Sequence, residues 1–255
     1  MNILAFDIET IPDVDGGRRL YDLHDLGDGE VAQIMFTKRR QQTESEFLPV
    51  HLQRVAAISA VLRAGEHCKV WSLGTPESSE KELIERFFDG IERYTPTLVT
   101  WNGSGFDLPV LHHRALIHGV PAPRYWDTGE DDREFKWNNY LNRFHARHTD
   151  VMDVLSGYQP RAFAPLDQVA VLCGLPGKMG MDGSKVWDAF QEGRIEAIRD
   201  YCETDALNTY LLYLRWLLIK GDLDEPRYGD ECKRVRDGLA AEDKPHFREF
   251  LNAWQ

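Results

Sequence analysis

The strongest constraint on the fold is the apolar run at residues 3–8, which only Asp7 interrupts. Short apolar runs of this kind are typical of a buried central strand. Two more β-rich stretches, residues 55–62 and 69–73, flank a turn at residues 63–66 and predict a hairpin. The sheet is therefore expected to begin with antiparallel strands.

The rest of the chain alternates between helical and strand patterns. A helix capped by Ser78 or Ser79 is predicted to run to about residue 94, because its apolar residues recur at helical spacing. Residues 97–101 and 149–151 are predicted strands, and residues 106–118, 166–173 and 195–219 are predicted helices. These patterns predict an α/β fold with a mixed central sheet of five to six strands flanked by helices.

The chain of 255 residues is long enough for one domain with a sizeable core, which we expect at residues 1–219. Residues 220–255 would form a C-terminal helical extension packed on it. Residues 174–183 contain four glycines and a proline and predict a loop. Residues from about 14 to 50 show no sustained periodicity, which indicates an irregular insertion beside the first strand.

Composition limits the class of protein. A hydrophobic fraction of 42% and a charged fraction of 28% are those of a soluble globular protein. No apolar run reaches 18 residues and no signal-peptide pattern opens the chain, so a cytoplasmic location without a membrane partner is expected. The four cysteines form neither a CxxC pair nor a disulfide framework, and we interpret them as reduced thiols, with zinc binding as the weaker alternative.

The net charge of −12 argues against a protein that coats duplex nucleic acid, because such affinity comes from Lys and Arg. It is compatible with an enzyme that contacts a few nucleotides at one strand end. Carboxylates that bind divalent cations make a site that attracts phosphate once the cations are present. The acidic balance therefore does not exclude a nuclease.

Three acidic motifs carry the candidate chemistry. Asp7 and Glu9 are two residues apart on the first strand, so they share one face and can converge on a cation. Asp107 follows a glycine-containing turn at the start of a helix, and Asp205 lies four residues after Tyr201 on one helical face. Each motif alone also has a structural explanation: an acidic strand end, a helix cap and a solvent-facing helical acid.

The order of the motifs is more specific than any one of them. It reads Asp-x-Glu at residues 7–9, Asn-x-x-x-Phe-Asp at residues 102–107 and Tyr-x-x-x-Asp at residues 201–205. This order resembles the DEDDy group of 3′–5′ exonucleases in the RNase H-like superfamily. It is most similar to a bacterial and phage family of predicted exonucleases related to the proofreading domain of family B DNA polymerases. The resemblance spans about residues 3–218.

The resemblance implies an enzyme that removes 5′-mononucleotides from the 3′ end of single-stranded DNA with two Mg²⁺ or Mn²⁺ ions. Asp7 would bridge both ions, Glu9 and Asp205 would complete the ion beside the attacking water, and Asp107 would support the ion at the leaving group. Hard cations prefer oxygen ligands, which fits a carboxylate-rich set. Tyr201 would orient the water, because a phenol with a pKa near 10 is a poor base at neutral pH.

Six further residues are expected to contact the substrate: Thr10, Ile11, Asn102, Phe106, Lys178 and Lys185. The resemblance implies that the two residues directly after the first motif hold the terminal nucleotide and that the asparagine contacts or shapes the strand path. The two lysines flank the glycine-rich loop and would contact phosphates. The alternatives are a strand end, a turn hydrogen bond and solvated loop lysines.

Other acids and histidines compete for these roles. Asp150 and Asp153 are alternatives to Asp107 as a ligand, but their place in the last strand favours a structural role. His145 and His148 would suit a sister exonuclease group that uses a histidine base. Tyr201 already occupies that position on the helix, so the tyrosine is preferred.

Two alternatives to a DNA exonuclease stay open. The same metal site cuts RNA or short oligonucleotides, and the sequence does not show whether the site excludes a 2′-hydroxyl. A catalytically silent nucleic-acid-binding module usually lacks one of the metal carboxylates, whereas here the set is complete. We expect no proofreading in cis, because the chain contains no polymerase domain, and action with a separate polymerase or repair partner stays open.

Overall fold

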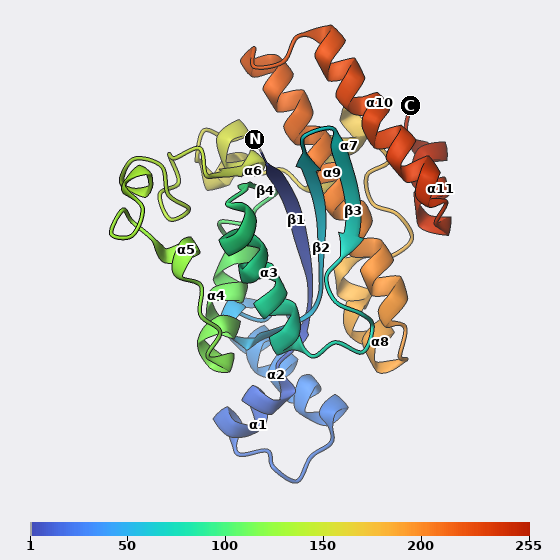
Figure 1. Cartoon of the computed structure of the whole chain (residues 1–255). Coiled ribbons are helices and arrows are strands. Elements are labelled where there is room, and N and C mark those ends of the chain that lie inside the picture. The colour runs from blue at the N-terminus through green and yellow to red at the C-terminus, as the bar shows by residue number, and fades with distance from the viewer. Residues whose placement is uncertain (1) are drawn as a thin grey trace.

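A mixed sheet of five strands lies at the centre of the computed structural model, which describes residues 2–255 (Figure 1). The strand order is β3-β2-β1-β4-β5. The bounds are β1 Ile3–Pro12, β2 Gln53–Ala64, β3 His67–Ser72, β4 Thr97–Thr100 and β5 His148–Asp150. The predicted α/β fold with a mixed central sheet flanked by helices is confirmed.

The strand β1 pairs antiparallel with β2 and parallel with β4, so it occupies the middle of the sheet. Its apolar residues are buried on both faces, as the run at residues 3–8 predicts. The predicted hairpin joins β2 to β3 through a turn in which Gly65 has a φ of +55°, a conformation that glycine adopts easily.

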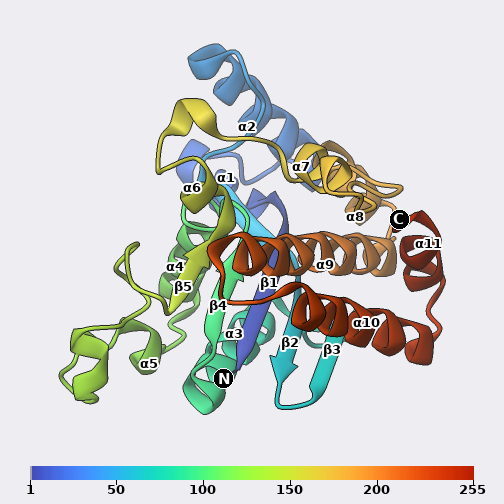
Figure 2. The same cartoon turned by 90° about the horizontal axis from the view of Figure 1, so that it is seen from above.

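Helices cover both faces of the sheet (Figure 2). On one face lie α3 (Glu80–Tyr94) and α4 (Asp107–His118), and the rings of Phe6 and Phe87 pack 4.7 Å apart between β1 and α3. On the other face lie α9 (Ile195–Lys220), α10 (Glu225–Glu242) and α11 (Pro245–Ala253). Of the two predicted caps of α3, Ser79 is the one that accepts a bond from the helix, from the Glu82 N–H at 3.3 Å.

The expected irregular insertion at residues 14–50 is wrong, because the segment contains α1 (Val14–Tyr21) and α2 (Asp28–Thr43). Glycines are typical of loops, but those of α1 permit close packing. A Cβ on Gly16 would lie 2.5 Å from Asp13 Oδ2, and one on Gly17 would lie 2.4 Å from Met35 Sδ on α2. The second helix has no long apolar stripe and buries only three residues, Val31, Ala32 and Met35.

The remaining elements are short. They are the helices α5 Pro123–Trp126, α6 Val151–Leu155, α7 Leu166–Leu172 and α8 Val186–Gln191, and the 3₁₀ turns Val50–Leu52, Arg133–Lys136, Pro160–Ala162 and Gly183–Lys185. The predicted loop at 174–183 has no helix or strand up to residue 182. The predicted domain boundary at residue 219 falls one residue before the end of α9. Across residues 2–255, the helices are all too short or too polar to span a bilayer.

A buried ion cluster joins three elements on the α3–α4 face. The guanidinium of Arg114 on α4 donates to Glu80 at 2.7 and 2.5 Å and to Asp13 at 2.6 Å. The Glu80 carboxylate, at the start of α3, also accepts the Val55 N–H of β2 at 2.7 Å. Asp13 is the residue between β1 and α1. The cluster therefore fixes the end of β1 relative to α3 and α4.

Candidate active site

The two carboxylates of β1 lie on the face of the sheet that α9 covers. The Cys202 thiol of α9 lies 3.3 Å from the Asp7 carbonyl oxygen and 3.7 Å from its Oδ2. Glu9 is buried, and the register of β1 against β2 shifts directly after it, between Glu9 and Thr10. Such a bulge re-aims side chains beside functional sites. Asp7 and Glu9 line the same cavity, as their spacing predicts.

Asp107 is not the cap of its helix. The residue before it, Phe106, is the N-cap of α4 and makes no side-chain capping bond. The Asp107 carboxylate instead accepts the Ile8 N–H of β1 at 3.2 Å and is buried. This contact brings the second motif beside the first, so the helix-cap explanation of Asp107 is wrong.

In the turn before α4, the backbone lies close to neighbouring side chains. Asn102 has a φ of +65°, and its carbonyl oxygen accepts the N–H groups of Gly105 and Phe106 at 3.0 Å. A Cβ on Gly103 would lie 2.5 Å from the Thr100 side chain, and one on Gly105 would lie 2.6 Å from Asn102 Oδ1. The path of the chain that carries Asp107 to β1 therefore favours Asn102, Gly103 and Gly105 at their positions.

The third motif faces this point from α9. Tyr201 is buried, Asp205 is half-buried, and both line the cavity of about 650 Å³ that Asp7, Glu9 and Asp107 also line. Three segments far apart in the sequence thus bring all five predicted catalytic side chains to one cavity. The solvent-facing explanation of Asp205 does not hold.

Burial and mutual repulsion raise the pKa values of these carboxyl groups. Burial is the main cause for Asp7 and Glu9, whose pKa values lie well above their ordinary range, and the nearby carboxylates add to it. Burial also raises the pKa of Asp107 to about 7 and that of Asp205 to about 6. Lys178 opposes the shifts of Glu9 and Asp205. The site therefore favours any arrangement that adds positive charge.

Among residues 2–255, the Cys202 thiol is the soft ligand that lies close to the carboxylates. Its sulfur and oxygens of Asp7 and Glu9 lie within 4.8 Å of one another. Burial, with Asp7 next, raises the pKa of the thiol, so the sulfur stays protonated beside the carboxylate. Cys202 is fully buried and does not line the cavity that the four carboxylates line. The donor set that remains is carboxylate oxygen, which fits Mg²⁺ or Mn²⁺ better than Zn²⁺.

The predicted substrate residues divide into two groups. Asn102, Phe106 and Lys178 line the cavity of the carboxylates, and Thr10 lines an adjoining cavity of about 850 Å³. The Ile11 side chain instead packs in the core against α8 and α9, and Lys185 lies exposed outside both cavities. The bulge after Glu9 explains Ile11, because it changes which residues of β1 face the cavity.

The α1–α2 segment and α8 contribute residues that no sequence pattern indicates. Phe47 lines both cavities, is 60% exposed and packs against Phe106 with ring centroids 5.3 Å apart. Arg39 of α2 lines the carboxylate cavity and donates to the Phe47 carbonyl oxygen at 2.8 Å. Trp187 of α8 lines the second cavity. Phe47 and Trp187 stand alone in the sequence, and the basic run at residues 38–40 does not by itself single out Arg39.

The competing acids and histidines have structural roles. Asp150 accepts the Asn102 and Ser104 N–H groups at 2.9 Å and so holds the turn, and Asp153 pairs with Arg143 at 2.9 Å. The His148 ring nitrogen lies 2.8 Å from Thr100 Oγ1, and burial lowers the pKa of this histidine to about 4. The preference for Asp107 and Tyr201 over these residues agrees with the geometry.

Metal-free protein is expected to lose stability as the pH rises from about 4 to about 7. The folded-state pKa of Asp107, about 7, lies above the value near 4 of an unfolded chain, so the folded state binds the extra proton and its advantage disappears over this window. An excess of Mg²⁺ or Mn²⁺, about 100 times the Kd, should then add about 2.7 kcal/mol. Thermal melts across this pH range, with EDTA and with metal, measure both effects.

The matched variant for this experiment is Asp107→Asn, which should have a shallower pH dependence without metal and a smaller gain with metal. Equal melting curves for the wild type with and without metal at pH 8 would contradict the expectation.

Comparison with known families identifies the relationship. A family of predicted 3′–5′ exonucleases related to the exonuclease domain of PolB matches residues 45–254. The chain belongs to this family. The matched residues include Asp107, Tyr201 and Asp205, whereas Asp7 and Glu9 precede them. The family relationship predicted from the order of the motifs is confirmed.

Curated relatives of this chain are DNA polymerases. The DNA polymerase epsilon catalytic subunit from Emericella nidulans is 26% identical over 146 residues, which are 55% of this chain and 6% of that protein. The corresponding protein from Saccharomyces cerevisiae is 24% identical over 147 residues, 55% of this chain and 6% of that protein. A DNA polymerase from Archaeoglobus fulgidus is 24% identical over 136 residues, 52% and 17% of the two chains. The chain thus matches only a small part of each polymerase.

Proposed function

We propose that this protein is a 3′–5′ exonuclease that uses two Mg²⁺ or Mn²⁺ ions to release 5′-mononucleotides from single-stranded DNA. One observation carries the proposal. Four carboxylates and a tyrosine, from β1, the start of α4 and the middle of α9, line a single open cavity. Buried carboxylates in such number need compensating positive charge, and divalent cations supply it.

The donor set fits these ions. Asp7, Glu9, Asp107 and Asp205 would hold them through oxygen, and their raised pKa values reflect how little positive charge the protein itself provides. The ions would lower the pKa of the attacking water and balance the charge that develops on the phosphoryl group and the leaving 3′ oxygen. This is the chemistry that hydrolysis of a phosphodiester requires.

The tyrosine would position the water rather than remove its proton. Burial, followed by the charge of Asp205, raises the pKa of Tyr201 far above neutral pH. A hydroxyl that stays protonated can hold a water molecule by hydrogen bonding but cannot act as a base. Tyr201→Phe would therefore keep the carboxylate set and lose the orientation of the water.

The two adjoining cavities offer a path for the 3′ end. Phe47 and Phe106 present their rings beside the carboxylates, and aromatic rings bind bases of any sequence by stacking. Lys178 is exposed at the same cavity, where it would contact a phosphate. Thr10 lines one of the two cavities and Asn102 lines the other.

Phe47→Ala is expected to raise the KM for a single-stranded oligonucleotide about 5- to 100-fold, because stacking on an aromatic side chain contributes about 1–3 kcal/mol per base. Hydrolysis of bis(p-nitrophenyl) phosphate, which has no base, should change little. Phe144→Ala is the matched control, since Phe144 is 72% exposed and lies outside both cavities. An unchanged KM for Phe47→Ala would contradict a role for Phe47 in stacking on a base.

A digestion ladder tests the proposed reaction. DNA and RNA 20-mers of the same sequence, each labelled at the 5′ end, are incubated with the wild type and Mg²⁺ or Mn²⁺. A DNA ladder that shortens stepwise and releases 5′-mononucleotides supports the proposal. Faster loss of RNA would assign the site to an exoribonuclease, and immediate release of the labelled nucleotide would show the opposite polarity.

The relatives also bear on the partner. They are polymerases in which the matched segment is a small part of a longer chain. We propose that residues 1–219 form the nuclease domain and residues 220–255 a helical extension, and that the protein acts with a separate polymerase or in repair.

A further inference from the structure

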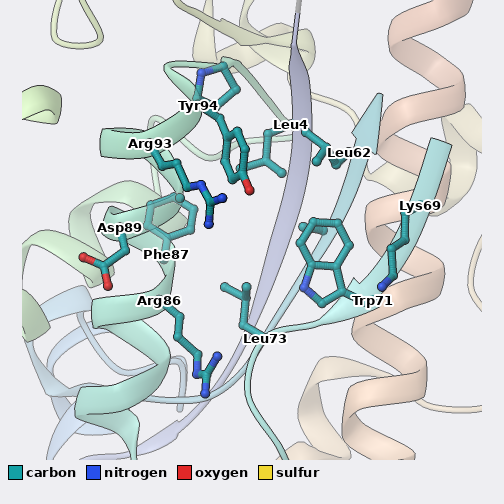
Figure 3. Close-up of a pocket in the computed structure, with 13 residues that line it drawn as sticks. Leu4, Leu62, Lys69, Trp71, Leu73, Arg86, Phe87, Asp89, Arg93 and Tyr94 are labelled. Atoms are coloured by element: carbon teal, nitrogen blue, oxygen red, sulfur yellow. The ribbon is translucent and has the colours of Figure 1, made fainter. Parts of the chain in front are cut away.

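The face of the sheet opposite the carboxylates is only partly covered. Helix α3 packs over β1 and the near side of β2, and beyond it a cavity of about 410 Å³ opens above β2 and β3 (Figure 3). Its floor and walls are apolar and include Leu62, Trp71, Leu73 and Tyr94. We call this cavity, lined by α3 and the β2–β3 hairpin, the hairpin groove.

The strand register explains why the groove is apolar. Trp71 on β3 pairs with Ala60 on β2, and Lys69 pairs with Leu62, so all four side chains share one face. The alternate pair Val61 and Val70 faces the opposite way, into the core beneath α9. The hairpin thus has apolar residues on both faces, and on the groove side α3 covers only part of β2 and leaves the cavity open. Unpaired apolar faces of this kind commonly bind a partner.

The rim of the groove is basic, although the chain has a net charge of −12. Lys69, Arg86 and Arg93 line it together with one acid, Asp89. Figure 3 shows Arg86 and Arg93 extending from α3 towards the side on which Trp71 stands.

Two of these cations have no anionic partner among the residues that the structure describes. Among residues 2–255, no carboxylate lies within 4.0 Å of the charged nitrogens of Lys69 or Arg93. Lys69 Nζ lies instead 5.9 Å from the centre of the Trp71 ring, and Arg93 Cζ lies 5.1 Å from that of Tyr94. Arg86 pairs only with the half-exposed Glu82 of its own helix, at 2.8 Å. The rim can therefore accept negative charge from outside.

We propose that the hairpin groove binds an acidic peptide segment of a partner protein. One or two large apolar side chains of the peptide would contact Trp71 and Leu73, and its carboxylates would lie near Lys69 and Arg93. The charge of the rim is complementary to such a segment, and the aliphatic floor suits side-chain anchors. Trp71 and Tyr94 could stack on bases, so a nucleic-acid strand is the rival occupant, but the leucines of the floor, Leu4, Leu62 and Leu73, favour peptide side chains.

The hairpin groove is separate from the carboxylate cavity. The groove and the carboxylate cavity share no lining residue and lie on opposite faces of the sheet. A bound peptide therefore leaves the carboxylates accessible. The proposal of peptide binding rests only on the residues of the groove, so it does not depend on the proposed reaction.

Selection from a random dodecapeptide library displayed on phage tests the proposal. The immobilised full chain is expected to enrich peptides with several Asp or Glu and at least one Leu, Phe or Trp. Synthetic versions of the enriched peptides should bind at least about tenfold more weakly to the double variant Lys69→Glu, Arg93→Glu, because exposed charge pairs contribute about 0.2–1 kcal/mol each and reversal makes them repulsive. Trp71→Ala should weaken the same peptides.

The matched control is the double variant Lys81→Glu, Lys233→Glu. It makes the same change in charge at two exposed lysines outside the groove and should bind the peptides as the wild type does. Thermal melts verify that all variants are folded. The proposal is overturned if no acidic family is enriched, or if the enriched peptides bind both double variants equally. It is also overturned if fluorescein-labelled dT₁₂ displaces the peptides and binds Lys69→Glu, Arg93→Glu more weakly than the wild type.

Discussion

Asp7→Asn is expected to lower the rate of 3′-end removal by about 10³-fold or more while the protein stays folded. Asp7 is the carboxylate for which the charges of three others, those of Asp107, Glu9 and Asp205, add to burial in raising the pKa. It therefore lies at the centre of the carboxylate cluster that we propose binds the cations. An amide in its place keeps the shape and removes that charge.

The same substitution should make the metal-free protein more stable, because it removes repulsion among buried carboxylates. Initial rates on a 5′-labelled oligonucleotide and thermal melts in EDTA measure the two effects. Asp237→Asn, an exposed acid on α10, is the control and should leave both unchanged. A variant that loses activity and also melts at lower temperature would indicate a structural role for Asp7.

Arg114→Met should destabilise the fold by about 3–5 kcal/mol, the cost of leaving buried charges without their partner. The guanidinium is the only group among residues 2–255 that forms an ion pair with Asp13, and it makes two of the contacts to Glu80. Both carboxylates are buried, so water cannot replace it. Arg114→Lys should restore little of the lost stability, since one ammonium group cannot reproduce the forked contacts of the guanidinium.

Urea unfolding of the wild type and the variants measures this effect. Arg86→Ala is the comparison, because its ion pair with Glu82 on the surface of α3 should contribute less than about 1 kcal/mol. A loss below about 1 kcal/mol for Arg114→Met would show that the cluster is not needed for the junction of β1, α3 and α4.

The sequence predicted the parts of the fold in which local pattern and burial agree. The run at residues 3–8 is apolar because β1 is buried on both faces, and α3 shows its apolar stripe because one side of it packs on the sheet. The order of the acidic motifs predicted which side chains meet at the cavity. One motif lies on a strand, one at the start of a helix and one within a helix, and tertiary packing brings the three together.

The α1–α2 segment could not be predicted in the same way. Gly16 and Gly17 are unfavourable in an isolated helix, and only the contacts with Asp13 and Met35 show why small residues are needed there. The role of Phe47 likewise depends on the packing of this segment against Phe106. Its aromatic ring beside the carboxylates is a property of tertiary structure.

The ion cluster of Arg114 is a similar case. Its members are separated by 34 and 101 residues, and a single arginine in a helix carries no sign of burial. For Cys202, the lack of a paired cysteine in the sequence indicates a reduced thiol. Its burial beside Asp7, outside the lining of the carboxylate cavity, is visible only in the folded chain.

The number of Mn²⁺ ions bound per chain tests the central claim most directly. Electron paramagnetic resonance of free Mn²⁺, titrated with the protein in the presence of 5′-TMP, should show about two bound ions for the wild type. Asp7→Asn should lose both or bind them at least about 100-fold more weakly, and Asp237→Asn should bind as the wild type does. Equal Mn²⁺ binding by the wild type and Asp7→Asn would contradict the assignment of these carboxylates to one metal site.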